Sequence, residues 1–176
     1  MSECYGKPVS ASMIEGHVHE IFPNDLNPND TVFGGRIMEI ADMLCSACSK
    51  LHTDRTCATL MVDSMRFLAP ATRGEILLFY VSINRAWRTS MEIGVKVVAS
   101  GAFSKLPRKV LSAFFTFVAL DEYNRPTPIL PVIPETDEQK RRYEDADRRR
   151  NERIRIAKEK QETLRLKKEN QNSEGD

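Results

Sequence analysis

The feature that most constrains the fold is one helical stripe followed by strand-like runs with only short links between them. Apolar residues recur at helical spacing from Ile37 to Leu51, and they include Ile40, Ala41, Leu44 and Cys48. Strand-like stretches then cover residues 56–68, 75–87, 90–103 and 109–120. One helix followed by consecutive strands predicts an α+β fold, with an antiparallel sheet packed against that helix.

The third strand-like stretch shows the clearest alternation. The apolar residues Met91, Ile93, Val95, Val97 and Ala99 alternate with Ser90, Glu92, Gly94, Lys96 and Val98. A period of two is typical of a half-buried strand, so the first set is expected to face the core. The sequence GHVHEIF at residues 16–22 suggests a further strand, and residues 69–75 and 121–126 have the composition of turns.

The composition changes sharply after Pro134. Of the 42 residues from 135 to 176, 25 are charged, and the proline-rich sequence PTPILPVIP precedes them. We therefore divide the chain into an N-terminal extension (1–12), a folded domain (13–133) and a charged tail (134–176). The tail is rich in good helix formers, but its apolar residues do not form a coiled-coil seam. This combination predicts a solvated tail that is helical or partly disordered. On this view, removing the tail leaves the activity of each site largely unchanged.

The overall balance of charge excludes several classes of protein. Lys plus Arg total 26 and Asp plus Glu total 25, so bulk charge does not favour a polyanionic partner. The basic runs at 140–142 and 148–150 are interleaved with acidic residues, which weakens a nucleic-acid-binding interpretation. Apolar runs are far shorter than the roughly 18 residues of a membrane helix. With no secretory signal and only four Cys, we expect a cytoplasmic, reduced protein that contacts no membrane.

One residue in the helical stripe needs a functional explanation. Asp42 lies among apolar residues, and none of its neighbours at three or four residues is basic (Met38, Glu39, Cys45 and Ser46). Asp is also a poor residue for a helix interior. An unpaired carboxylate on a largely apolar helix is costly, so we expect the protein to use Asp42 chemically.

Three stretches together carry a family resemblance: NPNDTVFGGRIMEIAD, VDSMRFLAPATRGE and WRTSMEIGVKV. In order and spacing they resemble the hotdog-fold acyl-CoA thioesterases, of the type that includes brain acyl-CoA hydrolase and its small bacterial relatives. The resemblance covers roughly residues 16–131. It implies a hotdog fold, in which an antiparallel sheet wraps a central helix. It also implies homodimers with a continuous sheet, often assembled as trimers of dimers, with active sites between subunits.

The resemblance implies a role for each matching residue. Asp42 matches the catalytic carboxylate, and Asn27 matches a polar partner contributed by the other subunit. Gly35, at the helix start, matches the group that polarises the thioester carbonyl. Asp30 and Thr31 depart from the usual pattern, so Thr31 is an alternative to Asn27. Acyl-CoA contacts are implied at Thr31, Gly34, Ser64, Met65, Phe67, Arg88, Thr89 and Ser90, and further candidates for the 3′-phosphate are Arg66, Lys96, Lys105, Arg108 and Lys109.

The chemistry of these residue types suits thioester hydrolysis. A carboxylate can act as a general base on water or as a nucleophile. Free backbone N–H groups at a helix start stabilise an oxyanion, and glycine lets a ligand approach them closely. No metal or cofactor is required, since coenzyme A is part of the substrate. The alternative function is a non-catalytic acyl-CoA sensor or scaffold with a partner-binding tail, because fold alone does not fix function.

Other chemistries are less well supported. Cys45, Cys48, His52 and Cys57 have spacings that could suit zinc, but the first two belong to the helical stripe and no Gly separates them. They also lie too far from the helix start for a redox pair. A hydroxyacyl dehydratase generally needs a His base beside the carboxylate, and His17, His19 and His52 fall outside the signature stretches. No G-x-S-x-G motif of a serine hydrolase occurs.

Overall fold

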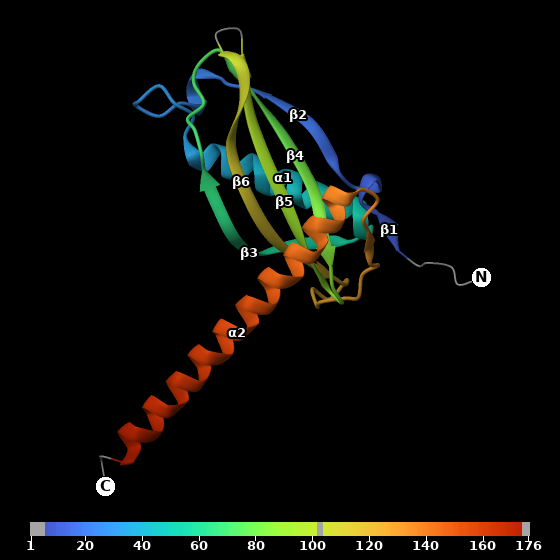
Figure 1. Ribbon diagram of the computed structural model, residues 1–176, viewed down its shortest axis with the longest axis vertical. Coiled ribbons are helices and arrows are strands. Elements are labelled where there is room, and N and C mark those ends of the chain that lie inside the picture. The colour runs from blue at the N-terminus through green and yellow to red at the C-terminus, as the bar shows by residue number, and fades with distance from the viewer. Residues whose placement is uncertain (1–5, 102–103, 174–176) are drawn as a thin grey trace, which may run out of the picture.

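The computed structural model describes residues 6–101 and 104–173, with side chains described at 6–101 and 106–165. A five-stranded sheet curls around one long helix, and a second long helix extends away from it (Figure 1). The strand order is β2-β4-β5-β6-β3, and every neighbouring pair is antiparallel. The bounds are β2 (Ile14–Glu20), α1 (Gly34–Thr53), β3 (Thr56–Phe67), β4 (Glu75–Ala86), β5 (Ser90–Gly101) and β6 (Ser104–Leu120).

The prediction of one helix packed on an antiparallel sheet is confirmed. Each of the four strand-like stretches forms a strand, and β2 supplies the fifth. The alternation in β5 is also confirmed, because Met91, Ile93 and Val97 are fully buried against the core. At the end of the helical stripe the expectation is wrong: Leu51 is 51% exposed, and His52 is buried in its place. The imidazole reaches Leu130, whose carbonyl oxygen lies 3.0 Å from His52 Nε2.

Several short elements complete the domain. Strands β1 (Lys7–Pro8) and β7 (Val132–Ile133) form a parallel pair, and the 3-10 turns η1 (Val9–Ala11) and η2 (Pro23–Asp25) flank β2. Val9 is 2% exposed and belongs to the main core. The described part of the N-terminal extension is therefore packed onto the domain, although sequence alone separated it at residue 12.

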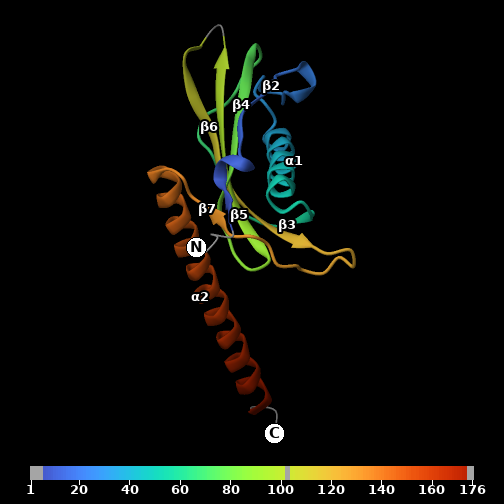
Figure 2. The same ribbon diagram turned by 90° about the vertical axis from the view of Figure 1, so that its right-hand side faces the viewer.

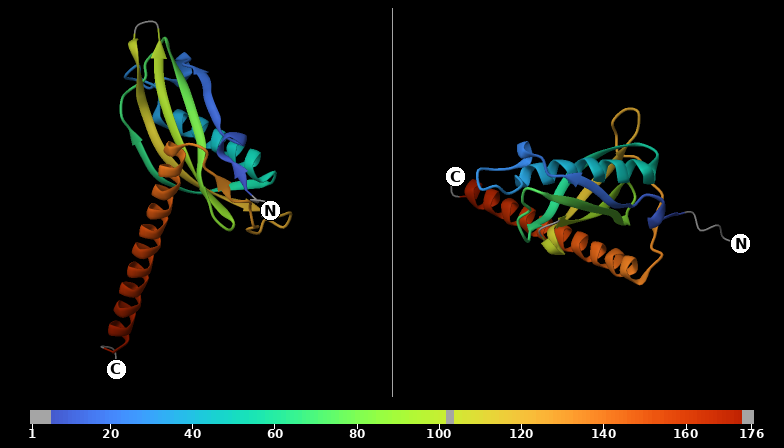
Figure 3. Two further views of the ribbon diagram at one scale, coloured as in Figure 1. Left: turned by 45° about the vertical axis from the view of Figure 1, so that its right-hand side comes forward. Right: turned by 90° about the horizontal axis from the view of Figure 1, so that it is seen from above.

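Helix α2 (Asp137–Ser173) lies on the face of the sheet opposite α1 (Figure 2). Its first turns pack on the sheet, where Ala146 is fully buried, and the rest of the helix projects past the domain (Figure 3). Sequence analysis treated this segment as solvated, but the structure uses it to cover part of the sheet. None of the helices among the described residues is long and apolar enough to cross a membrane.

Candidate functional site

Asp42 is half-buried on α1 and has one hydrogen-bond partner on the neighbouring strand. Thr59 Oγ1 on β3 donates to Asp42 Oδ1 across 2.7 Å. The other carboxylate oxygen has no partner among the residues that the structure describes. Sequence reasoning missed Thr59. A signal was present, because Thr59 lies on the same strand face as the buried Cys57 and so points a hydroxyl towards α1.

The start of α1 presents free backbone donors. Phe33 precedes the helix, and the amides of Gly34 and Gly35 find no acceptor within the described part of the chain. A Cβ at Gly35 would clash with the Phe33 ring, and a Cβ at Gly34 would lie 3.1 Å from the Phe67 ring. The Gly-Gly pair therefore allows two aromatic rings to flank an accessible helix N-terminus, where the helix dipole favours negative charge.

The loop before α1 carries both candidates for the polar partner. Asn27 Nδ2 donates to Thr31 Oγ1 at 2.9 Å, and Asn27 Oδ1 accepts the amides of Asn29 and Thr31 at 2.9 and 3.3 Å. Asp30 has φ 55°, in the left-handed region that Gly adopts readily and Asp tolerates. Asn27 and Thr31 thus act as one hydrogen-bonded unit, and the choice between them stays open.

Asp42 and the helix start do not meet within one chain. Asp42 lies seven positions after Gly35, which is about 10 Å along a helix that rises 1.5 Å per residue. The Gly35 amide and the Asp42 carboxylate therefore lie about two turns apart along α1.

The candidate acyl-CoA contacts fall in three places. Thr31 and Gly34 lie in the loop before α1 and at its start. Ser64, Met65 and Phe67 lie on β3, which is an edge strand of the sheet. The remaining three, Arg88, Thr89 and Ser90, lie at the β4–β5 hairpin, where Arg88 is exposed. The backbone carbonyls of Arg88 and Thr89 accept from the amides of Ile129 and Ala119 at 3.0 Å each, which fixes the hairpin against the end of β6 and the segment after it.

Arg108 is unsuitable for the 3′-phosphate because it is already engaged. Its guanidinium contacts both oxygens of Glu75, with Nη2 2.7 Å from Oε2, and also donates to the carbonyl oxygen of Pro70. Glu75 is 5% exposed, and it accepts the Thr72 amide at 2.8 Å. The Lys105 side chain lies outside those that the structure describes, and Lys96 and Lys109 are exposed on the far side of the sheet from α1.

This ion pair predicts a measurable acid sensitivity. Hydrogen bonding to Arg108 lowers the pKa of Glu75 to about 2 from an ordinary value of 4.5. The stabilisation is therefore complete above about pH 4.5 and is lost as the pH falls towards about 2. Between about pH 5 and 3, the urea midpoint should fall more for the wild type than for Glu75→Gln. Equal falls would show that the pair does not contribute.

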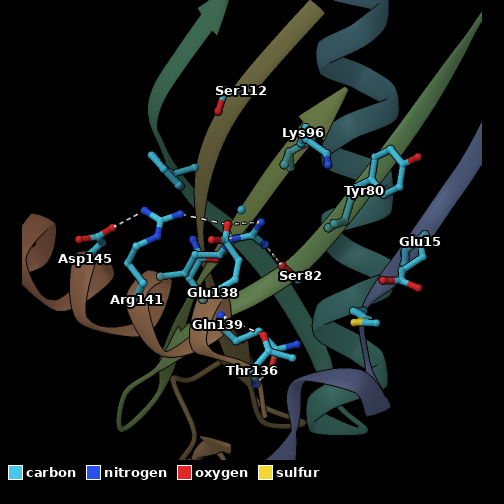
Figure 4. Close-up of a pocket in the computed structure, with 18 of the residues that line it drawn as sticks. Glu15, Tyr80, Ser82, Lys96, Ser112, Thr136, Glu138, Gln139, Arg141 and Asp145 are labelled. Carbon is cyan, nitrogen blue, oxygen red and sulfur yellow. Dashed lines mark hydrogen bonds and ion pairs between the residues drawn. The ribbon is translucent and has the colours of Figure 1, made fainter. Parts of the chain in front are cut away.

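A cavity of about 550 Å³ lies on the other side of the sheet, between the first turns of α2 and the strands (Figure 4). Tyr80 and Lys96 lie on its sheet side, where the Lys96 ammonium sits 4.3 Å from the centre of the Tyr80 ring. On the helix side, Arg141 is paired with Glu138 and Asp145. The sheet separates this cavity from Asp42 on α1.

The described cysteines and histidines do not form a cluster of metal ligands. Among the described residues, no group of three or more His, Cys, Asp or Glu side chains could hold an ion. Cys45 and Cys48 are fully buried, and burial raises the pKa of the Cys48 thiol to about 12, which opposes thiolate chemistry. His52 bonds to Leu130, and His19 lies beside Asp25. Among the described contacts, neither histidine lies next to Asp42.

Comparison with known proteins gives a consistent result. Residues 29–102 match the model of the thioesterase superfamily. An uncharacterized acyl-CoA thioester hydrolase of Bacillus subtilis is 33% identical over 76% of this chain and 77% of its own length. A hexameric acyl-CoA thioesterase has a similar structure, with a TM-score of 0.82 and 31% identity, covering 85% of this chain and 96% of that one.

An acyl-CoA hydrolase from Staphylococcus aureus is equally similar. It was solved with butyryl coenzyme A, coenzyme A and coenzyme A disulfide. Its TM-score is 0.81 at 29% identity, covering 91% of this chain and 97% of that one. Variants of the same hydrolase that carry alanine in place of one aspartate, one threonine or one asparagine have also been solved and are similarly close to this chain.

Proposed function

This chain belongs to the thioesterase superfamily, and we propose that it hydrolyses acyl-CoA thioesters with Asp42 as the catalytic carboxylate. The observation that carries the proposal is the half-buried Asp42 carboxylate, with one oxygen held by Thr59 and the other unpartnered among the described residues. The free oxygen is available to take a proton from water or to attack the thioester carbon. The three residue types replaced in the Staphylococcus aureus variants are those of Asp42, Thr59 and Asn27.

In the general-base version, Asp42 accepts a proton from water as the water oxygen bonds to the carbonyl carbon. The carbonyl oxygen becomes an oxyanion, which the free amides of Gly34 and Gly35 stabilise. The C–S bond then breaks, and coenzyme A leaves as a thiolate that takes up a proton. In the nucleophile version, the Asp42 oxygen bonds to the carbonyl carbon, and the C–S bond breaks to release coenzyme A as a thiolate that takes up a proton. Water then cleaves the resulting anhydride, which releases the acid and restores the Asp42 carboxylate. Neither version requires a cofactor.

We assign the two halves of each site to two copies of the chain. Asp42 comes from one copy, and Asn27 and the Gly34–Gly35 amides come from the other, because Asp42 lies about two turns along α1 from the helix start. Strand β3 supports a shared sheet: it is an edge strand, and Leu60, Met61 and Val62 on it are 66%, 37% and 40% exposed. An exposed apolar edge strand is a ready surface for pairing. The hexameric relative supports a trimer of such dimers.

Subunit mixing tests both the activity and the shared site. We expect the wild type to release coenzyme A thiol from a panel of short to long acyl-CoAs. Asp42→Asn and Asn27→Ala homodimers should be nearly inactive. A heterodimer of the two, isolated with two different tags, contains one intact site in two, so it should recover about half of the wild-type activity.

Each outcome has a clear meaning. Recovery in the heterodimer supports an interfacial site, since neither chain alone holds a full set of groups. A heterodimer as inactive as its parents would mean that the groups act within one chain. A wild type that binds acyl-CoA but turns over none of the panel would instead favour the sensor or scaffold.

A further inference from the structure

Asp25 is a buried carboxylate that the proposed reaction does not use. Its side chain is 3% exposed, and it lies two residues before Asn27. It accepts the Phe22 amide at 2.9 Å and Arg36 Nε at 3.0 Å, and His19 Nε2 lies 3.0 Å away. Charge-assisted hydrogen bonds of this kind are stronger than neutral ones, so the carboxylate holds its partners firmly.

The partners of Asp25 come from separate elements. His19 belongs to β2, Phe22 precedes η2, and Arg36 lies in the first turn of α1. The backbone carbonyl of Asp25 also accepts the Phe33 amide at 2.8 Å. Asp25 therefore lies just before the loop that carries Asn27 and is bonded to the start of α1, which comes just after that loop.

That loop is closed at its base, and its tip makes an exposed contact, from Arg73 Nη2 to Asp30 Oδ1 at 3.5 Å. Leu26 and Val32 form an antiparallel bridge, and the Asn27 amide donates to the Thr31 carbonyl at 2.8 Å. The tip residues Pro28, Asn29 and Asp30 are exposed. The position of Asn27 relative to α1 thus depends on the base of the loop, where Asp25 sits.

A further acid contacts the cluster but cannot replace Asp25. Arg36 Nη1 donates to Glu39 Oε2 at 2.8 Å, one turn along α1, and Glu39 is 58% exposed. This second pair lies on the helix, and among the described residues Glu39 makes no hydrogen bond or ion pair with the loop. Asp25 therefore supplies the carboxylate that links Arg36 to the loop base, with His19, Arg36 and Glu39 as the charged or titratable groups around it.

We propose that Asp25 is a positioning residue: it ties the loop base to the first turn of α1, so that Asn27 and the Gly34–Gly35 amides reach the same thioester. The inference rests on the proposed function, because Asn27 and the two amides form one half of the proposed site. Asp25 does not touch the substrate. It acts by fixing the relative position of groups that do.

The first test replaces Asp25 with Asn, which keeps the shape of the side chain and removes its charge. We expect kcat to fall about 10- to 100-fold, since misplacement of about 1 Å has effects of this size, with KM changed less than about threefold. The matched control is Glu92→Gln on the opposite face of the sheet. Glu92 is a fully buried carboxylate paired with Arg149 at 2.6 Å, so its loss should lower the Tm but leave kcat per folded molecule unchanged.

A double-mutant cycle separates positioning from a general loss of stability. In an Asn27→Ala background, Asp25→Asn should lower kcat further by less than about twofold, because Asp25 acts through the loop that holds Asn27. Fully multiplicative effects would overturn the proposal. An unchanged kcat in Asp25→Asn, or an equal loss in Glu92→Gln, would overturn it as well.

Amide hydrogen exchange provides a readout independent of activity. Residues 26–35 should exchange faster in Asp25→Asn than in the wild type, and should be unchanged in Glu92→Gln. If the wild type hydrolyses no acyl-CoA, the proposed function fails while the exchange comparison still tests the link. Unchanged exchange in Asp25→Asn would overturn the positioning role whatever the activity.

Discussion

Asp42→Asn is expected to lower kcat for acyl-CoA hydrolysis by about 100- to 10,000-fold and to leave the fold intact. The asparagine side-chain oxygen can still accept the hydrogen bond from Thr59, so the geometry around residue 42 is kept. The amide neither takes a proton from water nor attacks a carbonyl carbon at neutral pH. Thiol release under saturating substrate measures kcat, and circular dichroism checks the fold.

Two further variants make this result specific. Asp54→Asn, at the other end of α1, removes an exposed carboxylate and should leave kcat unchanged. Thr59→Val removes the hydrogen bond to Asp42 and should lower kcat roughly tenfold, the size expected for a bond to a charged group. Full activity in Asp42→Asn would contradict the catalytic assignment.

A single turnover in ¹⁸O-labelled water distinguishes the two versions of the mechanism. With a nucleophilic carboxylate, water opens the anhydride, and mass spectrometry should find label in the peptide that contains Asp42 when attack is at the side-chain carbon. With a general base, the label should appear only in the released acid. Label in the Asp42 peptide would therefore establish the nucleophile, whereas an unlabelled peptide fits both the general base and attack of water at the acyl carbon of the anhydride.

Arg149→Ala is expected to lower the free energy of unfolding by about 3 kcal/mol. Glu92 on β5 is fully buried, and it is held by Arg149 from α2 and by Asn84 Nδ2 at 2.9 Å. Removing the guanidinium would leave a buried charge with only Arg153, 3.8 Å away, as a basic neighbour among the described residues. The Arg149 guanidinium also lies 3.8 Å from the centre of the Phe114 ring, and that contact would be lost too. Urea denaturation measures the change.

The adjacent arginine supplies the control. Arg148 is 76% exposed and pairs with Asp145 of its own helix, so Arg148→Ala should cost less than about 1 kcal/mol. Equal effects of the two variants would show that Glu92 does not depend on Arg149.

A chain ending at Pro134 lacks every α2 contact, so we expect it to be unstable rather than fully active.

The sequence predicted the strands well because local alternation reports which side faces the core. β5 shows this most clearly: Met91 to Ala99 alternate as expected. The position of α1 and the Gly-Gly start followed from local signals of the same kind. Asp42 was also identifiable, since an acid within an apolar stripe is visible without any knowledge of the fold.

Contacts between distant elements could not be predicted in this way. The bond from Thr59 to Asp42 depends on how β3 lies against α1, which local patterns do not report. Glu92 was correctly placed on the outer face of β5, but outer does not mean exposed here, because α2 covers it. The charges of α2 resemble those of a solvated helix, but some of them bind the sheet. Arg149 pairs with Glu92 of β5, and Asp147 pairs with Arg85 of β4.

The separation of Asp42 from Gly35 along α1 has a consequence in mixed populations of subunits. Suppose that each site takes Asp42 from one copy and Asn27 from the other. A variant that lacks only one of these residues then inactivates one of the two sites in a mixed dimer. Activity then falls in proportion to the share of defective subunits. A chain that lacks both residues inactivates both sites of any dimer that it joins. Activity then falls with the square of the fraction of intact subunits. Such a doubly defective chain would act as a dominant inhibitor in a cell that also makes the intact protein.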